Sequence, residues 1–378
     1  MFRKYLVWLV IGLFLSLNVF IAPSGIGVPS TSVDSHTGTI LYVGGSGPGN
    51  FSCIQDAVDR ADDGDTVFVF AGVYDERVVI TRSITLVGQY RDTTIIDGGN
   101  GGKVVWIKAD DVVVSNFTIQ NAGKDISDAG VEIKNNGNYA RISHNVILNC
   151  NNGISIAGAD NVEISYNTIK YGVGHISPNG IRCSESYEGD NAMRVVIHDN
   201  HISHYDDGIA LHEASDIRVF NNVISDNSGT GLFTSLSDHG HVYGNTIVDN
   251  GGCGIYLRGS PFILFRDWVV EDNDISYNAY DGIFVSGRGY GVKILRNLVC
   301  GNQRAGVDFH AMYFCSVKYN NLVDNEVNGF FQNLWFSSWR SNYWSGYEGS
   351  GPKLITGNQL GISWVFCDWF PAKEPYII

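Results

Sequence analysis

The chain has 378 residues, enough for one large domain or two ordinary domains, and its formal net charge is −14 with only 25 Lys and Arg. Nucleic acid and anionic lipid both bind basic surfaces, so this charge argues against either as the main partner. The 45 glycines and only 8 prolines are typical of a chain that turns often and pairs many strands in ladders.

The first 40 residues differ from the rest. Arg3 and Lys4 precede an apolar run from Tyr5 to Ala22, a pattern typical of a secretory signal peptide. The run also just reaches the length of a membrane-spanning helix, so an uncleaved anchor remains the alternative. Residues 23–40, rich in Ser, Thr and Gly, predict a flexible spacer. We therefore expect residues 1–22 to be a signal peptide or an N-terminal membrane anchor of a secreted or cell-surface protein.

The 7 cysteines do not suggest a disulfide framework. Their number is odd, and no two of them form a CxxC motif. For an exported chain this predicts free thiols that are mostly buried.

A short helix is predicted near the start of the folded part. Ser52 and Gln55 have the spacing of a capping box, and Ile54 and Ala57 begin a helical apolar pattern that ends before Gly64. Alternating strands such as "TVFVF" and "RVVI" follow. We expect this segment to be an N-terminal helical cap, because the end of a stacked sheet must be covered.

From residue 130 onward one phrase recurs: a glycine followed by a short alternating strand, as in "GISI" and "GIAL". The glycines are Gly130, Gly153, Gly180, Gly208, Gly231, Gly254, Gly282, Gly306 and Gly329, spaced 23 to 28 residues apart. A second phrase, Asn-x-apolar, recurs with them at Asn145, Asn167, Asn200, Asn222, Asn245, Asn273, Asn297 and Asn320. A period of this length is typical of a solenoid.

Each period holds only short β segments and turns, so successive copies must stack as parallel strands about 4.8 Å apart. The sequence therefore predicts an all-β, single-stranded parallel β-helix over residues 41–333, with 11 or 12 coils. Apolar residues should form inward columns, and Asn at a fixed corner should bond the backbone of the next coil. Residues 334–378 lose the phrase and become rich in aromatic residues, which predicts a C-terminal cap.

Several segments resemble a known family. "YVGGSGPGNFSCIQDAVDRADDGDTVFVFAGVYDERVVI", "ITLVGQ" and "TTIIDG" resemble the entry segment of NosD-like right-handed parallel β-helix proteins, many of which are exported archaeal proteins. "NYWSG" and "DWFPAKEPY" resemble their closing segment. The resemblance implies the fold, within a pectin-lyase-like superfamily whose carbohydrate-binding and sugar-hydrolysis (CASH) repeats occur in lyases, hydrolases, epimerases and binding proteins. It does not imply one activity.

Alternation places every second residue after each glycine on the outside. The first outward column then reads Glu132, Ser155, Arg182, Ala210, Phe233, Tyr256, Phe284, Asp308 and Phe331. The second reads Lys134, Ala157, Ser184, His212, Ser235, Arg258, Ser286, His310 and Asn333.

Three aromatic residues of the first column fall on successive coils, and this predicts a binding platform. Phe233, Tyr256 and Phe284 could stack on sugar rings, with Arg182, Arg258 and Asp308 beside them to hold hydroxyls or carboxylates. The alternative is that loops or the aromatic tail cover these rings, which then only stabilise the sheet.

Candidate catalytic residues lie in "HDNHISHYDDGIALHE". Asp206 and Asp207 could divide acid and base roles across a glycosidic bond, as paired Asp residues do in polygalacturonase-type β-helices. That family's other signals are missing, and Asp281 also precedes a rung glycine, so Asp207 is equally explained as a turn residue. A lyase or epimerase would instead use His212 as a base with Arg182 or Arg258 as the cation.

A metal site at His198, His201 and His204 is a weaker interpretation, although NosD-like proteins are associated with copper by name. Residues three apart on a strand face opposite sides, so these imidazoles should not converge. The sequence contains no calcium-binding nonapeptide, P-loop or dinucleotide motif, and we predict neither a metal nor a cofactor.

Two functions follow. The first is an exported protein that binds polysaccharide or cell-envelope glycan without catalysis. The second is a polysaccharide lyase, epimerase or glycoside hydrolase acting on glycans that contain uronic acid. The leader, the aromatic outward column and the missing hydrolase signals favour the first function, and the second is the alternative.

Overall fold

The computed structural model describes residues 38–378 except 175–176, 186–188, 261 and 263–264. The expected signal peptide or anchor and most of the expected spacer lie outside the described residues. Within the described part, no helix is long and apolar enough to cross a membrane.

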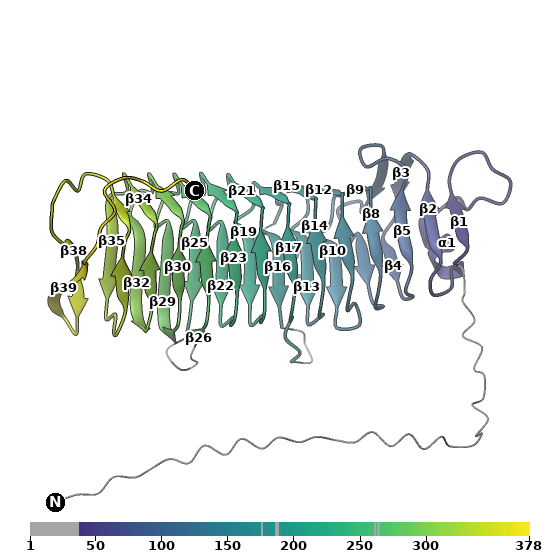
Figure 1. Cartoon of the computed structure of the whole chain (residues 1–378). Helices are drawn as coiled ribbons and strands as arrows, with labels where there is room; N and C mark the ends of the chain where they lie inside the picture. Colours follow the sequence, from purple (N-terminus) through teal and green to yellow (C-terminus); the bar gives the residue numbers. More distant parts are fainter. Residues whose placement is uncertain (1–37, 175–176, 186–188, 261, 263–264) are drawn as a thin grey trace, which may run out of the picture. The chain divides into compact units, whose positions relative to one another are not determined.

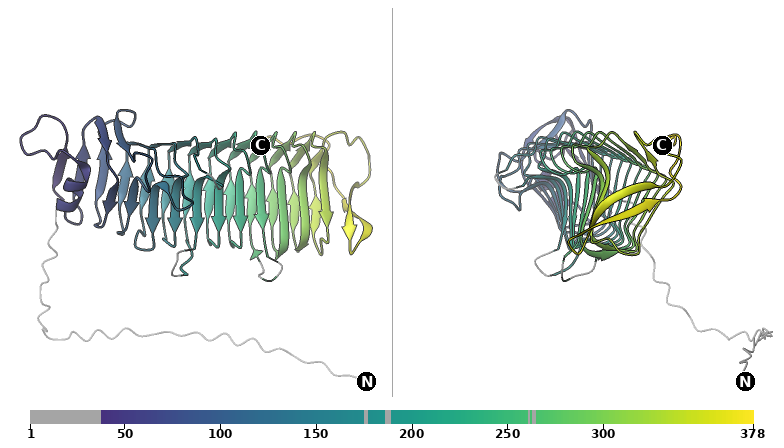
Figure 2. Two further views of the ribbon diagram at one scale, coloured as in Figure 1. Left: turned by 180° about the vertical axis from the view of Figure 1, so that it is seen from behind. Right: turned by 90° about the vertical axis from the view of Figure 1, so that its left-hand side faces the viewer.

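The chain from Ile40 onward winds into a parallel β-helix of about 14 turns, which confirms the predicted fold class (Figure 1). A typical coil contributes three strands, β13 (Asn152–Ala157), β14 (Glu163–Ser165) and β15 (Thr168–Lys170). Each pairs in parallel with its counterpart one coil later, so the coils superimpose when viewed along the axis (Figure 2). The number of turns exceeds the 11 or 12 predicted, because the segment before Gly130 also coils instead of only capping the end.

The solenoid has three faces. The face that we call the long-strand face is built from β4 (Val78–Ile80), β7 (Val105–Ile107), β10 (Ala129–Lys134), β13, β16 (Asn179–Ser184), β19 (Asp207–His212), β22 (Leu232–Ser235), β25 (Ile255–Arg258), β29 (Ile283–Tyr290), β32 (Ala305–Tyr313) and β35 (Val327–Gln332). The face that we call the second face is built from β1 (Ile40–Val43), β2 (Thr66–Val69), β5 (Thr85–Gly88), β8 (Val113–Ser115), β11 (Arg141–Ser143), β14, β17 (Val196–His198), β20 (Arg218–Phe220), β23 (His241–Tyr243), β27 (Val269–Glu271), β30 (Lys293–Leu295), β33 (Ser316–Lys318) and β36 (Ser338–Arg340).

The third face is a separate sheet of 12 strands. They are β3 (Gly72–Asp75), β6 (Thr94–Asp97), β9 (Thr118–Gln120), β12 (Val146–Leu148), β15, β18 (His201–Ser203), β21 (Val223–Ser225), β24 (Thr246–Val248), β28 (Asp274–Ser276), β31 (Leu298–Cys300), β34 (Asn321–Val323) and β37 (Tyr343–Trp344). A two-residue strand, β26 (Phe265–Arg266), pairs beside β29.

The core consists of inward columns of apolar side chains, as the alternation predicted. One column on the third face reads Ile147, Ile169, Ile202, Ile224, Ile247, Ile275, Val299 and Leu322, and every member is fully buried. The rung glycines are required by close packing against these columns. A Cβ at Gly208, for example, would lie 2.4 Å from Cγ2 of Ile224. All seven cysteines fall within the described residues and are free, and four of them are buried.

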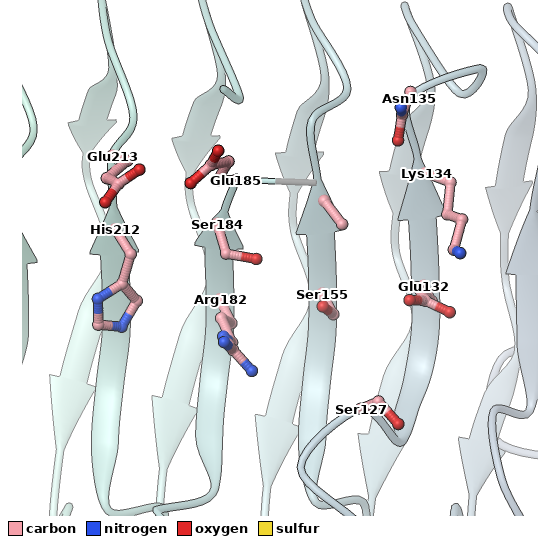
Figure 3. A pocket seen from close by; sticks show the side chains of 11 residues that line it. Ser127, Glu132, Lys134, Asn135, Ser155, Arg182, Ser184, Glu185, His212 and Glu213 are labelled. Carbon is pink, nitrogen blue, oxygen red and sulfur yellow. The ribbon is translucent and has the colours of Figure 1, made fainter. Parts of the chain in front are cut away.

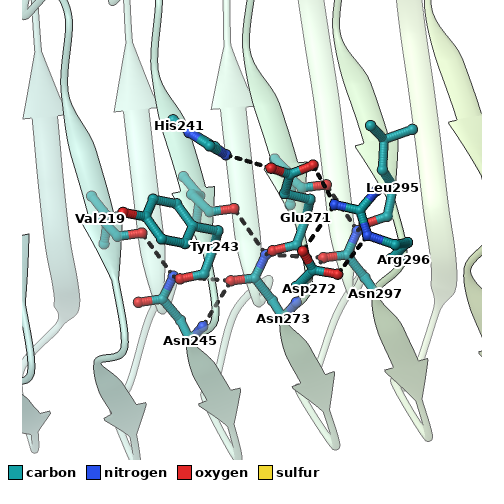
Figure 4. A network of polar contacts seen from close by, with 12 residues as sticks. Val219, His241, Tyr243, Asn245, Glu271, Asp272, Asn273, Leu295, Arg296 and Asn297 are labelled. Atoms are coloured by element: carbon teal, nitrogen blue, oxygen red, sulfur yellow. Dashed lines mark hydrogen bonds and ion pairs between the residues drawn. The ribbon is translucent and has the colours of Figure 1, made fainter. Parts of the chain in front are cut away.

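A ladder of buried asparagines runs along the corner between the second and third faces (Figure 4). Its members are Asn145, Asn167, Asn200, Asn222, Asn245, Asn273, Asn297, Asn320 and Asn342. The side-chain amide of Asn245 donates to Oδ1 of Asn273 (2.9 Å) and to the carbonyl of Val219 (2.9 Å), and the backbone N–H of Asn245 donates to the same Oδ1 (2.9 Å). The expected bonding between coils is therefore confirmed.

A second ladder at another corner was missed from the sequence. It contains Asn227, Asn250, Asn278, Asn302 and Asn325, joined in the same way. Its signal was present as an Asn five residues after each member of the first ladder from Asn222 to Asn320.

The predicted helix is present as α1 (Ile54–Arg60), but its predicted capping box is wrong. Cys53 is the N-cap residue and makes no capping bond with its side chain. The carboxylate of Glu76 instead accepts hydrogen bonds from the N–H groups of Ile54 (2.8 Å) and Gln55 (2.9 Å). Each oxygen of this carboxylate accepts one orphan N–H, and the full negative charge makes these bonds stronger than those of a neutral serine hydroxyl.

The C-terminal segment forms an antiparallel hairpin of β38 (Lys353–Gln359) and β39 (Ile362–Asp368) beyond the last coil (Figure 1). The hairpin pairs with β35 and β36 only at a few residues. The carboxylate of Asp368 ends the first asparagine ladder, because Asn342 donates to it. That α1 and this hairpin act as end caps stays a prediction.

The ladders lead to a stability prediction. Asn302→Ala should lower the free energy of unfolding by about 2–4 kcal/mol, because it leaves buried polar groups of Asn278 and Ile275 without their partner. Urea denaturation followed by circular dichroism measures this. Gln303→Ala, an exposed neighbour in the same turn, is the control and should change stability by less than about 0.5 kcal/mol. Equal effects of the two substitutions would show that the ladder bonds contribute little.

Candidate functional site

The outward columns of the long-strand face are those that the sequence predicted, as far as Asp308. Cross-strand registers align Glu132, Ser155, Arg182, Ala210, Phe233, Tyr256, Phe284 and Asp308 in one line. At the next rung the prediction is wrong, since Phe330 and not Phe331 lies beside Asp308. Gly329 aligns with Val307 instead of Gly306, and this one-residue shift turns Phe331 into the core, where it is fully buried. For the same reason Gln332 replaces Asn333 in the second column.

An open groove of about 380 Å³ lies over β10, β13, β16 and β19 (Figure 3). Its lining brings together two of the predicted residues, Arg182 and His212, which lie on neighbouring coils. It also contains charged residues that the sequence reasoning did not select: Glu132, Lys134, Glu185 and Glu213. The signal for the last two was their position directly after Ser184 and His212, at the ends of their rungs.

Two carboxylates of this groove, Glu185 and Glu213, lie together. A hydrogen bond from Glu185 is the largest cause that raises the pKa of Glu213, and burial and the charge of Glu185 add to it. Such a pair holds a proton more tightly than a lone carboxylate.

The surroundings of His212 favour its neutral form. Burial lowers its pKa most, and the positive charges of Arg182 and Arg258 lower it further. The edge of its ring meets Phe233, with the ring centres 5.6 Å apart. A neutral imidazole beside a guanidinium can accept a proton from an anionic substrate that the guanidinium holds.

The three aromatic residues continue from the groove along the same column. The rings of Phe233 and Tyr256 meet at 64° with centres 5.4 Å apart, whereas Tyr256 and Phe284 stack at 28° and 4.7 Å. All three are half-buried, and the C-terminal hairpin lies at the end of the solenoid and not across them. The Tyr256–Phe284 pair covers one face of each ring, so the column offers fewer free ring faces than the sequence suggested.

Asp308 lies in the predicted column but is only 1% exposed. Its Oδ1 is 3.2 Å from Nε2 of His310, which is the accessible member of this pair. Arg258 is exposed at the edge of the second column, next to Ser235 and Ser286. Any ligand at this end of the column would therefore meet Arg258 and His310 before Asp308.

The structure does not bring Asp206, Asp207 and His212 into one site. Asp207 and His212 stand at opposite ends of β19, roughly 16 Å apart along the strand. Asp207 Oδ1 accepts the N–H of Thr230 (2.7 Å), and Asp281 Oδ1 accepts that of Ala305 (2.9 Å) in the equivalent position. Both bonds tie a turn to the next coil, which is the turn role that the sequence offered as the alternative. Asp206 itself contacts the hydroxyl of Ser228 (3.3 Å).

The histidines do not converge. His198 belongs to the second face, where its ring stacks on Phe220 (4.8 Å) and contacts Asp199 and Glu163. His201 belongs to the third face, and His204 packs on Tyr171. Over the residues that the structure describes, no group of three His, Cys, Asp or Glu side chains could hold a metal ion.

A family model described as a right-handed beta helix region matches residues 129–270. No curated relative matches the sequence. Similar solved structures include PfbA, a surface adhesin of Streptococcus pneumoniae (TM-score 0.58, 14% identity, covering 85% of this chain and 95% of that one). Another is the A-module of the Azotobacter vinelandii mannuronan C-5 epimerase AlgE6 (0.58, 18%, 85% and 93%).

The catalytic unit of a GH87 alpha-1,3-glucanase from Streptomyces thermodiastaticus is also similar (TM-score 0.58, 16% identity, 83% of this chain and 66% of that one). At these identities the likeness shows the right-handed β-helix fold and nothing finer. The NosD-like and archaeal character implied by the sequence stays a prediction.

The buried turn carboxylate gives a pH prediction. Burial is the main cause that raises the pKa of Asp207 to about 6, from 3.8. The folded state therefore holds this proton more tightly than the unfolded state, and stability falls as pH rises from about 4 to about 6. Asp207→Asn keeps the acceptor for Thr230 and removes the buried charge. It should be more stable than the parent by about 1–3 kcal/mol at pH 7, and equal to it near pH 4.

Urea denaturation at several pH values measures this difference, with Asp249→Asn, an exposed aspartate, as the control. A stabilisation that grows toward low pH would contradict the assignment.

Proposed function

We propose that this protein is an exported, secreted or cell-surface protein that binds a polysaccharide along its long-strand face. One observation carries the proposal. The charged groove and the aromatic residues occupy consecutive rungs of the same outward columns, so they form one continuous surface. From β10 to β29 these rungs extend over roughly 30 Å, at about 4.8 Å per coil. A linear ligand of several sugar units fits such a site better than a small molecule does.

The chemistry of the site supports a glycan. Binding sites typically combine apolar surface with a few polar groups that fix orientation. Here Phe233 supplies apolar surface beside the groove, while Arg182 and His212 supply donors to hydroxyls and carboxylates. Ala210 separates Arg182 from Phe233 in the column and is fully buried beneath its larger neighbours. An adhesin, an epimerase and a glucanase have similar folds, which is consistent with a surface or glycan-related role.

The proposal that the protein is exported rests on residues 1–22, which resemble a leader. This segment would either be cleaved or anchor the protein at its N-terminus.

The first test removes one ring. Phe233→Ala should weaken retention by a bound polysaccharide in affinity electrophoresis about five-fold, since an aromatic contact contributes about 1 kcal/mol. Phe220→Ala is a matched control, because Phe220 belongs to a stack of rings on the second face. Equal retention of the two variants, or no retention of the parent by any acidic or neutral polysaccharide, would refute the proposal.

A second candidate function is acid–base chemistry on a uronic acid in the groove, as in a lyase or epimerase. The neutral His212 beside Arg182, together with the paired carboxylates of Glu185 and Glu213, favours it. The predicted hydrolase pair, Asp206 and Asp207, lies outside this groove.

This candidate predicts that polyuronates incubated with the protein gain unsaturated ends or exchange the C5 hydrogen with solvent. His212→Gln should abolish the reaction, because it removes the base. His241→Gln, on the second face, should leave it unchanged. Ultraviolet absorbance and proton NMR measure the two products, and their absence across alginate, polygalacturonate and glucuronan would leave binding as the function.

A further inference from the structure

Next to the groove, on the same face, three lysine side chains gather at one indole ring. The Nζ of Lys108 lies 3.3 Å from the centre of the Trp106 ring, and those of Lys103 and Lys134 each lie 5.4 Å from it. Trp106 belongs to the outward column, beside Glu132. We call these four residues the lysine–indole cluster. It continues the binding face by one coil, because Lys134 also lines the groove.

Such crowding of like charges is unexpected in this protein. The chain has only 25 Lys and Arg residues against 39 Asp and Glu residues, so three lysines around one ring stand out. Burial lowers the pKa of Lys103 most, and the charges of Lys134 and Lys108 lower it further, against an opposing effect of Asp128. Each ammonium therefore raises the electrostatic cost of the other two. A single ammonium over the indole would give the cation–π stabilisation without this repulsion.

The neighbouring carboxylate does not block the cluster. Glu132 is buried, and its Oε2 lies 3.1 Å from Nζ of Lys103. It therefore neutralises the innermost ammonium, while Lys108 and Lys134 remain half-exposed. An anion that approached the face would meet the outer two ammonium groups first.

Only small side chains lie between the lysine–indole cluster and Arg182. Ser155 and Ala157 occupy the coil between them in the two outward columns. Lys134 and Arg182 thus stand two coils apart, roughly 10 Å, on either side of two small side chains. Both cations line the same groove of about 380 Å³.

We propose that the lysine–indole cluster, together with Arg182, is an anion-binding site that recognises carboxylate or sulfate groups on the glycan held by the long-strand face. The inference rests on the proposed function and specifies its ligand as an acidic polysaccharide. Ammonium and guanidinium groups bind both anions through charge-assisted hydrogen bonds. The charged units lie over β7 to β16, and the aromatic part of the face takes the neighbouring units.

Affinity electrophoresis with two matched pairs of polymers tests this assignment. Polygalacturonate and its methyl ester differ only in the free carboxylate, and dextran sulfate and dextran differ only in the sulfate. The parent should be retained at least ten-fold more strongly by one or both charged members than by their neutral counterparts. Retention should also fall between 20 and 500 mM NaCl, because salt screens exposed charges. Which charged polymer is retained distinguishes carboxylate from sulfate as the group recognised.

The double variant Lys108→Gln, Lys134→Gln should lose about ten-fold in retention by the charged polymer and keep its retention by the neutral one. Lys293→Gln, Lys318→Gln removes the same charge from the second face and should bind as the parent does. Melting curves of both variants show whether the fold is intact.

Equal loss in the two double variants, or equal retention by the neutral and charged polymers, would overturn the acidic-ligand assignment and leave polysaccharide binding standing. If no polymer is retained by the parent, the proposed function fails and this inference fails with it. If the Lys108 and Lys134 variant melts early, the single variant Lys108→Gln must still show selective loss for the charged polymer, or the assignment is wrong.

Discussion

The stacked side-chain amide of asparagine is the interaction on which this fold depends. Each ladder member bonds to the next member and to the backbone of a neighbouring coil, so consecutive coils are held in one register. The residue before each ladder Asn adopts left-handed backbone even where it is Tyr166 (φ 55°) or Arg296 (φ 52°). This conformation costs such residues about 1–2 kcal/mol. The structure tolerates the cost because an alternative corner would leave buried amides unpaired.

Fixed register has a direct chemical consequence on the outside. Side chains at equivalent positions are repeated about every 4.8 Å, which is close to the contact distance of two aromatic rings and well within the range of Coulomb interactions. Rings therefore stack, as Tyr256 does on Phe284, and carboxylates such as Glu185 and Glu213 come within hydrogen-bond reach. A β-helix of this kind builds a site from columns and not from a deep cavity. Ligands that extend along the axis match it best.

How much the sequence could predict follows from this geometry. Strand alternation and the spacing of the rung glycines are repeated nine times, so the fold and the outward column were predictable from Glu132 to Asp308. Gly329 broke the rule because the turn before its rung is one residue shorter than the turn of the preceding coil. Only pairing with the neighbouring strand shows this, since Cys300 aligns with Val323 but Ala305 aligns with Val327. The capping of α1 by Glu76 depends on a contact between separate strands, and no local motif encodes it.

The site was only partly predictable, for the same reason. The outward positions of Arg182 and His212 could be predicted, because they follow from counting residues after each rung glycine. Trp106, Lys103 and Lys108 precede the first rung glycine, so the repeat did not align them with Lys134. The separation of Asp207 from His212 could be estimated from strand rise, but the burial that raises the pKa of Asp207 required the packed turn.

The contrast between the two outward faces argues for the long-strand face as the binding surface. Rungs of the second face are three or four residues long. Its rings lie nearly parallel, His198 to Phe220 at 1° and Phe220 to Tyr243 at 8°. Such a stack presents ring edges to solvent. Its flanking charges are paired with one another, as Arg296 is with Glu271 and Asp272 (Figure 4).

The rungs of the long-strand face are up to nine residues long. They carry two outward columns side by side, and the 64° tilt between Phe233 and Tyr256 interrupts the stack next to the groove. The second face also has an open groove, of about 540 Å³, which is lined by charged residues such as Glu163 and Arg194. Width and the combination of a charged groove with tilted aromatic rings therefore favour the long-strand face, and groove volume does not.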